Sequence, residues 1–309
     1  MAIWNAEELP QPTRDALRLE SDLFEYGYCV ISPALDPPSL DAARDRLLEQ
    51  AEAERTLGYE FRDHAELEQS TNQWVYMVVN KGKVFEQLFE HPLVVRLMTM
   101  LLGPEYQLSA ADGRIVHPGN TPQTMHSGQW FIPSTVMPGE RAPSAGAITR
   151  TDQGSSEATI AEHPIQPCMQ ANVLWMLSDF TEANGATRVT PRSHWSGKQP
   201  DPTASDNIET VAAVAPAGSA LVLDGRTWHG AGINQTNHSR AALATSYCVP
   251  QLRPMENYSL GSLPAVLADA SPALLTRLGR KPWSGYGIVG NPQAEFVDPE
   301  NQVIGELKP

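Results

Sequence analysis

Two histidines and one arginine of this chain have the types and spacing that metal chemistry requires. His126 lies in residues 123–130, which read QTMHSGQW. His229 lies in a glycine-rich turn, and Arg240 opens an apolar stretch eleven residues later. Two histidines on one face of Fe(II), usually joined by one carboxylate, are typical of non-haem oxygenases. An arginine nearby can pair bidentately with the carboxylate of a co-substrate.

Several motifs in a fixed order resemble the phytanoyl-CoA dioxygenase family. They are residues 123–130, residues 177–194 (LSDFTEANGATRVTPRSH) and residues 229–240 (HGAGINQTNHSR), within a similarity that extends from about residue 22 to residue 292. The resemblance implies a double-stranded β-helix, the jelly-roll or cupin-like barrel. It also implies Fe(II) as cofactor, and 2-oxoglutarate and O2 as co-substrates. The chain therefore resembles a non-haem oxidoreductase.

Carried over position by position, the resemblance assigns roles to single residues. His126 and His229 would ligate iron, and Arg240 would bind the distal carboxylate of 2-oxoglutarate. Gln123 and Asn172 would hydrogen-bond the same co-substrate. These residues form the expected iron and co-substrate site.

Gly128 departs from the family pattern, which has an iron-ligating carboxylate two residues after the first histidine. Glycine has no side chain that can bind a metal. The same replacement is typical of 2-oxoglutarate-dependent aliphatic halogenases, in which chloride or bromide takes the free position. That resemblance implies halogenation of an unactivated C–H bond of a small molecule, by ferryl hydrogen abstraction and halogen rebound. Ser127 and nearby backbone N–H groups are candidate halide contacts, because anions favour convergent amides.

Other interpretations of Gly128 stay open. One is an oxygenase of the same family, in which a natural or introduced glycine replaces the aspartate and the product is hydroxylated, desaturated or rearranged. Asp112 or Asp224 is a candidate for a carboxylate supplied from elsewhere. Glycine can also answer a purely backbone requirement. The remaining alternatives are an inactive enzyme, a metal-dependent isomerase or cupin-like lyase, and a non-catalytic barrel that binds a small molecule.

Three further residues are candidates for contact with substrate. Trp130 follows the first histidine motif, where barrel packing is the alternative interpretation. Arg188 and Arg192 lie in the second motif, and Arg192 replaces the glycine of a Pro-Gly-Ser-His turn. A substrate carboxylate or phosphate would suit both arginines, although pairs with surface carboxylates would satisfy them equally. The polar stretch 133–166 is expected to be a lid or binding loop.

Helices followed by short strands are expected to position these residues. Apolar periodicity predicts helices over 8–27, 40–54 (with Ser39 as N-cap) and 83–102, and a helical segment over 259–280. A short strand is expected at 28–31, and further strands at 106–117, 124–132, 167–178, 186–190, 210–215, 219–223 and 240–249. The fold class is mostly β, a jelly-roll with flanking α-helices. We expect a single domain over 1–309, with a helical part to about 105, a jelly-roll core over 106–258, and a C-terminal helix and tail over 259–309.

Composition restricts the partners of this protein. The 309 residues carry a net charge of −14, which disfavours nucleic acid and anionic membranes as partners. Cys29, Cys168 and Cys248 have no metal-binding spacing and indicate reduced thiols in a cytoplasm. We see no signal peptide and no apolar run long enough to cross a bilayer. A small-molecule substrate is the expected partner, and the oligomeric state, a homo-oligomer included, stays open.

Overall fold

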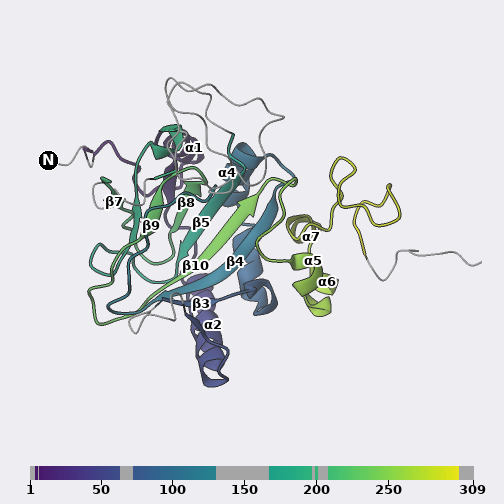
Figure 1. The fold of residues 1–309 in the computed structure, drawn as a ribbon, viewed down its shortest axis with the longest axis horizontal. Helices are drawn as coiled ribbons and strands as arrows, with labels where there is room; N and C mark the ends of the chain where they lie inside the picture. The colour runs from purple at the N-terminus through teal and green to yellow at the C-terminus, as the bar shows by residue number, and fades with distance from the viewer. Residues whose placement is uncertain are drawn as a thin grey trace, which may run out of the picture.

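Two antiparallel sheets form the centre of the molecule. The computed structural model describes residues 4–5, 7–62, 72–129, 167–196, 199–200 and 208–298. The strands are β1 (Tyr28–Ile31), β2 (Phe61–Arg62), β3 (Asn72–Val75), β4 (Gln107–Val116), β5 (Gln170–Met176), β6 (Thr187–Val189), β7 (Val211–Ala212), β8 (Ala220–Asp224), β9 (His229–Ala231) and β10 (Arg240–Cys248). The larger sheet has the order β1-β8-β5-β10-β4-β3-β2, and the smaller one the order β7-β6-β9 (Figure 1). The expected fold class, mostly β with flanking helices, is confirmed.

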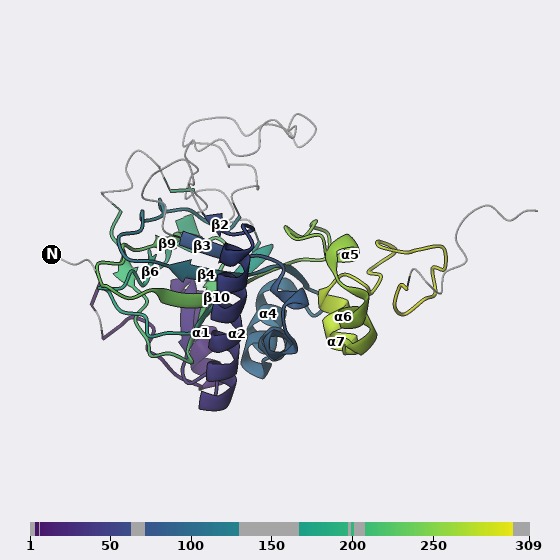
Figure 2. The same cartoon turned by 90° about the horizontal axis from the view of Figure 1, so that it is seen from below.

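Helices cover one face of the larger sheet and one end of the molecule. They are α1 (Ala16–Tyr26), α2 (Pro37–Thr56), α3 (Glu86–Phe89), α4 (Pro92–Leu102), α5 (Tyr258–Gly261), α6 (Pro264–Asp269) and α7 (Pro272–Arg277). Figure 2 shows α1, α2 and α4 side by side below the sheet, with α5, α6 and α7 beyond its edge. The opposite face of the sheet therefore lines the interior of the barrel.

Capping residues and prolines set helix boundaries that periodicity alone placed wrongly. The first helix begins at Ala16 rather than at residue 8, because the side chain of Asp15 accepts hydrogen bonds from the next turn. The second begins at Pro37 rather than at residue 40, with Asp36 rather than Ser39 as its N-cap. The expected helix 83–102 is divided before Pro92, and the segment 259–280 is divided into three short helices.

The strand predictions agree better with the structure. Each expected strand outside 124–132 coincides with one of the strands above. In 124–132 the described residues contain only an isolated bridge between His126 and His229. The expected lid 133–166 and the tail from residue 299 lie outside the described residues, so neither expectation is tested.

Strict alternation along β10 separates the apolar core from the cavity of the barrel. Leu243 and Tyr247 face the helices, in a cluster that also contains Leu47 of α2 and Trp175 of β5. Arg240, Ala242, Ala244 and Ser246 face the other way and line a cavity. The barrel interior contains a second apolar cluster, with Phe180, Val189, Leu221 and Leu223. Burial on both faces therefore fixes the register that points Arg240 inward.

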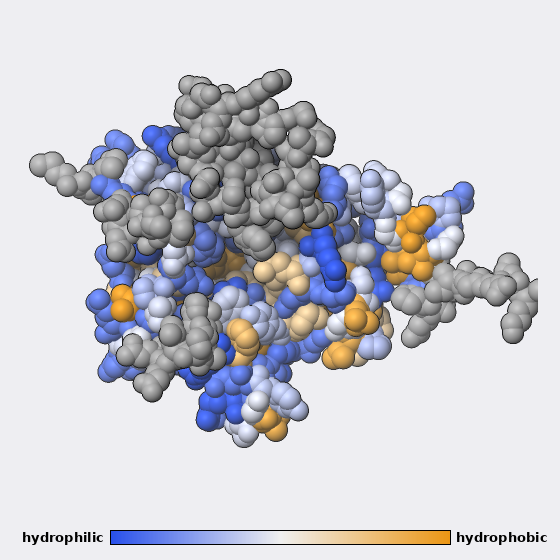
Figure 3. Space-filling view, viewed as in Figure 1, coloured by the Kyte–Doolittle hydropathy of each residue, from blue (hydrophilic) through white to orange (hydrophobic). Residues whose placement is uncertain are grey.

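The surface is mixed over the barrel and apolar in places near the C-terminal helices. Leu260 and Leu263 are 85% and 50% exposed. Orange patches in Figure 3 lie where Figure 1 draws these helices. Among the described helices, none has the length and apolar content that a membrane span requires.

Candidate active site

A bridge between two chain segments places His126 and His229 side by side. The backbone N–H of His126 donates to the carbonyl of His229 at 3.0 Å, and that of His229 donates to the carbonyl of His126 at 2.8 Å. Residues paired in this way project their side chains to the same face. The two ring centroids are 4.6 Å apart. Residues 103 positions apart in the chain thus form one histidine pair.

Each imidazole uses Nδ1 for a backbone contact, and no described residue binds its Nε2. Nδ1 of His126 lies 2.9 Å from the carbonyl of Thr124, and Nδ1 of His229 lies 2.9 Å from the carbonyl of Thr227. Because a carbonyl can only accept, each Nδ1 carries the proton and each Nε2 is left with its lone pair. Burial lowers the pKa of His126, and it lowers the pKa of His229 to about 3. Both rings are therefore neutral at physiological pH, as metal binding requires.

Arg240 supplies a buried positive charge to the same cavity. Its side chain is 3% exposed, and its Nε has no hydrogen-bond partner. Its guanidinium stacks on Phe180, with Cζ 4.1 Å from the ring centroid. No ion pair joins Arg240 to an acidic residue in the described part of the chain. Burial lowers the pKa of Arg240 to about 10, so the side chain stays charged and requires an anion.

The cavity has a volume of about 250 Å³ and brings most of the predicted site together. It is lined by His126, His229, Gly128, Ser127, Gln123, Asn172 and Arg240, among others. Asn172 has a buried Oδ1 without a partner, which leaves it able to bind a ligand. Gln123 accepts a hydrogen bond from Ala231 N at 3.3 Å, and the Ser127 hydroxyl donates to Gln199 at 2.9 Å. The position of these residues agrees with the predicted roles, which stay predictions.

The carboxylate that Gly128 lacks is not replaced by another described residue. The described part of the chain contains no cluster of three histidine, cysteine, aspartate or glutamate side chains. Asp112 is paired with Arg114, and Asp224 with Arg226. Asp224 also lies on the opposite face of the sheet from Asn172, whose register partner is Leu223. The two suggested substitutes are therefore engaged elsewhere.

Gly128 lies in a tight place. A Cβ at this position would lie 3.1 Å from Nδ2 of Asn172 and 3.3 Å from the carbonyl of Gly225. The backbone N–H of Gln129 donates to that carbonyl at 3.0 Å. A small residue therefore lets residues 126–129 approach the turn that precedes His229.

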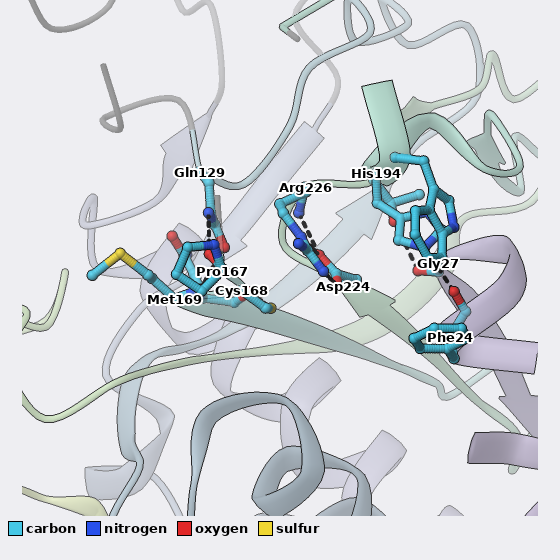
Figure 4. Close-up of polar contacts among 12 residues, drawn as sticks. Phe24, Gly27, Gln129, Pro167, Cys168, Met169, His194, Asp224 and Arg226 are labelled. Carbon is cyan, nitrogen blue, oxygen red and sulfur yellow. Dashed lines mark hydrogen bonds and ion pairs between the residues drawn. The ribbon is translucent and has the colours of Figure 1, made fainter. Parts of the chain in front are cut away.

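Polar contacts outside the cavity hold both histidine segments in place (Figure 4). Oε1 of Gln129 accepts a hydrogen bond from the backbone N–H of Met169 at 2.6 Å, which ties the first segment to the start of β5. Asp224 binds the guanidinium of Arg226 at 2.6 Å before the second segment. These contacts fix the backbone on which His126 and His229 stand.

Of the three predicted substrate contacts, the structure places Arg188 and Arg192 outside the cavity and does not test Trp130. Trp130 lies outside the described residues. The guanidinium of Arg188 donates to Glu182 at 2.6 Å and to Thr210 at 2.8 Å, outside the cavity. Arg192 pairs with Glu25 on the surface. Neither arginine lines the cavity, because β6 turns the side chain of Thr187 inward and that of Arg188 outward.

The sequence interpretation missed a second cavity arginine, Arg114 of β4. It lines the cavity together with Trp74 of β3, its partner in register. The signal was present in the sequence as Asp112 and Arg114, the two charged residues of this strand, at alternate positions. Alternate charges in such a strand face the same side and must be paired or solvated.

Comparisons with known proteins show the family of this chain. The model of the phytanoyl-CoA dioxygenase (PhyH) family matches residues 23–242, and the chain belongs to that family. "Dioxygenase af480" of Aspergillus fumigatus is 26% identical over 92% of this chain and 85% of its own. "Dioxygenase andF" of Emericella variicolor is 34% identical over 62% of this chain and 59% of its own. Membership makes this protein a non-haem Fe(II)/2-oxoglutarate-type oxidoreductase.

Solved structures support the fold. The carbocyclase SnoK from nogalamycin biosynthesis superposes with a TM-score of 0.57 at 18% identity, over 87% of this chain and 93% of that chain. The epimerase SnoN, solved in complex with Fe3+, alpha ketoglutarate and nogalamycin RO, gives a TM-score of 0.55 at 18% identity, over 81% and 90% of the two chains. Iron and 2-oxoglutarate are the cofactor and co-substrate of this class. The free Nε2 pair and the unpaired Arg240 fit them.

Proposed function

We propose that this protein is an Fe(II)- and 2-oxoglutarate-dependent oxygenase that hydroxylates, desaturates or rearranges a small-molecule natural product. One observation carries the proposal. Two neutral histidines and one buried arginine share a single cavity, and no described residue binds their Nε2 atoms or supplies the arginine with a counter-ion. Relatives named as dioxygenases, and the names epimerase and carbocyclase among structures of the same fold, support this range of reactions.

Each described residue has a distinct task in such a reaction. His126 and His229 would hold iron, which supplies the oxidation of 2-oxoglutarate by O2. Arg240 would bind the distal carboxylate of 2-oxoglutarate, for which its planar fork is suited. The amides of Asn172 and Gln123 would orient the co-substrate. Burial of the site excludes bulk water and strengthens these charged contacts.

Halogenation is a second candidate, and Gly128 favours it. Because no described residue replaces the carboxylate, the site offers room for an exogenous ligand beside the two histidines. Chloride or bromide is a candidate for that ligand, and Ser127 would lie next to it. The relatives give no support to this chemistry, so oxygenation is the preferred proposal.

An anaerobic titration tests both candidates. Fe(II) is added to the protein, then 2-oxoglutarate, with and without chloride, while the visible metal-to-ligand charge-transfer band is followed. We expect a band that depends on both Fe(II) and 2-oxoglutarate. A band that does not respond to chloride supports the oxygenase, whereas a chloride-dependent shift supports the halogenase.

Variants of the two histidines test whether the charge-transfer band depends on them. His126→Ala and His229→Ala should each abolish the band, because one histidine cannot replace the pair. Arg188→Gln is the matched control, since this arginine is engaged outside the cavity. Absence of a band in the unaltered protein would contradict the proposed function and leave a barrel that only binds small molecules.

A further inference from the structure

The cavity contains two arginines, and the proposed co-substrate engages only one of them. Arg114 and Arg240 both line it, and no acidic residue is among the described residues at its wall. Asp112 neutralises Arg114, whereas Arg240 has no acidic partner among the described residues, so these residues give the cavity one uncompensated positive charge. A cavity lined by one sign of charge concentrates ligands of the opposite sign. The proposed function assigns Arg240 to 2-oxoglutarate and leaves Arg114 without a ligand.

The guanidinium of Arg114 is held rigidly along one edge and one face. Nε is bound by one carboxylate oxygen of Asp112, and Nη2 donates to the other at 3.2 Å. Cζ lies 3.2 Å from the ring centroid of Trp74. Asp112 is 3% exposed. A buried carboxylate and an aromatic ring thus fix the orientation of the arginine before any ligand binds.

No described residue occupies the second edge of the same guanidinium. Arginine presents five N–H groups as two forks, and Asp112 occupies only the Nε–Nη2 fork. Among the described residues, no partner is found for Nη1 or for the second N–H of Nη2, which together form the other fork. The side chain is 28% exposed and lines the cavity. A fork of this geometry matches a carboxylate bidentately.

The position of Arg114 suits a substrate beside the proposed iron site. It faces Ala242 across the β4–β10 ladder, two residues along β10 from Arg240. Both arginines line the same cavity as His126 and His229. The two arginines therefore stand side by side on one sheet face, and each can hold a separate anionic group near the histidines.

We propose that Arg114 is a substrate-binding residue, and that the substrate is a small molecule with a carboxylate that binds the free Nη1–Nη2 fork. This inference rests on the proposed function, because Arg240 must be occupied by 2-oxoglutarate. Asp112 and Trp74 act as positioning residues for the arginine. The substrate carboxylate brings the rest of the molecule to the side of the cavity that contains Asn172 and Gly128.

The test measures binding of matched carboxylates and amides. The probes are benzoate, hexanoate and 3-phenylpropionate, each compared with its primary amide by calorimetry. The protein is loaded with Fe(II) and saturating 2-oxoglutarate without oxygen. We expect at least one carboxylate to bind about tenfold or more tightly than its amide, as loss of a charged hydrogen bond typically costs. Binding of no probe, or equal binding of acid and amide in every pair, would overturn the inference.

The variants remove the arginine without leaving a buried charge unpaired. In Asp112→Asn/Arg114→Gln both charges are lost together, because removal of one alone would destabilise the protein. The double variant should lose the preference for carboxylates, and Arg114→Lys should keep only part of it, since lysine has no fork. Arg188→Gln should retain the full preference. A preference that survives in the double variant would assign the carboxylate to another residue.

Affinity for 2-oxoglutarate separates failure of this inference from failure of the proposed function. The double variant should bind 2-oxoglutarate as the unaltered protein does. A tenfold weaker binding would mean that Arg114 holds the co-substrate, which overturns the inference and leaves the function intact. If the unaltered protein binds neither Fe(II) nor 2-oxoglutarate, the proposed oxygenase function is contradicted. Binding of the carboxylate and amide probes to the metal-free protein then tests the role of Arg114 by itself.

Discussion

At the scale of single residues, the site depends on which atom each side chain leaves unused. Nδ1 of His126 and Nδ1 of His229 each donate to a backbone carbonyl, and no described residue binds their Nε2 atoms. Among the described residues, the buried Arg240 has no counter-ion, and the buried Oδ1 of Asn172 has no hydrogen-bond partner. Unpaired buried polar groups cost free energy unless a ligand satisfies them. Arg240 and Asn172 line the same cavity, so one ligand there could satisfy both.

Arg240→Ala should weaken 2-oxoglutarate binding by about tenfold to a hundredfold, because a bidentate charged contact is lost. The affinity of Arg240→Lys for 2-oxoglutarate should lie between those of the unaltered protein and of Arg240→Ala, because lysine keeps the charge but lacks the planar fork. Affinity is measured by anaerobic titration of the Fe(II)-loaded protein. Arg188→Gln is the control. An unchanged affinity in Arg240→Ala would remove this residue from the co-substrate site.

Gly128→Asp should bind Fe(II) about tenfold or more tightly than the unaltered protein, because a carboxylate joins the two histidines as a third ligand. Loss of residues that only support metal ligands already changes metal affinity by about 10- to 100-fold. Asn172 must move by a few tenths of an ångström to admit the new Cβ. Gly128→Ala is the matched control, since it adds the Cβ without the carboxylate. Equal iron affinity in the two variants would show that position 128 does not face the metal.

At the scale of elements, two loops and one strand fix the histidine pair. The loop 123–129 and the turn before β9 meet at the bridge between His126 and His229. Gly225 lies where this turn passes β5, and a Cβ there would be 2.1 Å from the carbonyl of Gln170. The atom that this Cβ would meet belongs to the backbone of β5 and not to a flexible side chain, so it cannot move aside easily. The close approach of the turn to β5 therefore requires glycine.

Gly225→Ala should destabilise the protein by about 1–3 kcal/mol, as overpacking typically does, and weaken Fe(II) binding as well. Gly261→Ala is a suitable control, because its Cβ would meet only the flexible end of Met77. Unfolding in denaturant and metal titration measure the two effects. Loss of stability without loss of iron affinity would contradict the link between this contact and the histidine pair.

At the scale of the whole molecule, His194 links α1 to the barrel. Its Nε2 donates to the carbonyl of Phe24 at 2.9 Å, whereas its Nδ1 is buried without a partner (Figure 4). Burial lowers the pKa of His194 below that of an unfolded histidine. As the pH falls, His194 is therefore protonated in the unfolded chain before it is protonated in the folded chain. Its contribution to the free energy of unfolding is fully present above about pH 6.5 and is lost as the pH falls below that value.

His194→Gln should flatten part of the pH dependence of stability. Between pH 7.5 and 5.5, the free energy of unfolding of the unaltered protein should fall more than that of the variant, by up to about 1.4 kcal/mol for each pH unit below 6.5. Glutamine can still donate to Phe24. His238→Gln, at an exposed histidine, is the control. Parallel pH profiles for His194→Gln and the unaltered protein would contradict this role.

Local sequence determined much of the fold. Period-2 runs located most strands, because alternation within one strand needs no knowledge of its neighbours. Helix starts were less well predicted, since the caps Asp15 and Asp36 compete with other polar residues nearby. The ordered motifs around His126, His229 and Arg240 were enough to name the expected iron and co-substrate residues.

Only the tertiary structure decided what those residues have as neighbours. Pairing of β4 with β3 and β10 put Arg114 into the cavity, whereas the β6 register turned Arg188 out of it. The same pairing showed Asp112 and Asp224 engaged by arginines rather than beside Gly128. The physical reason is that alternation along a strand is local, whereas the face that each row of side chains shares depends on strands distant in sequence.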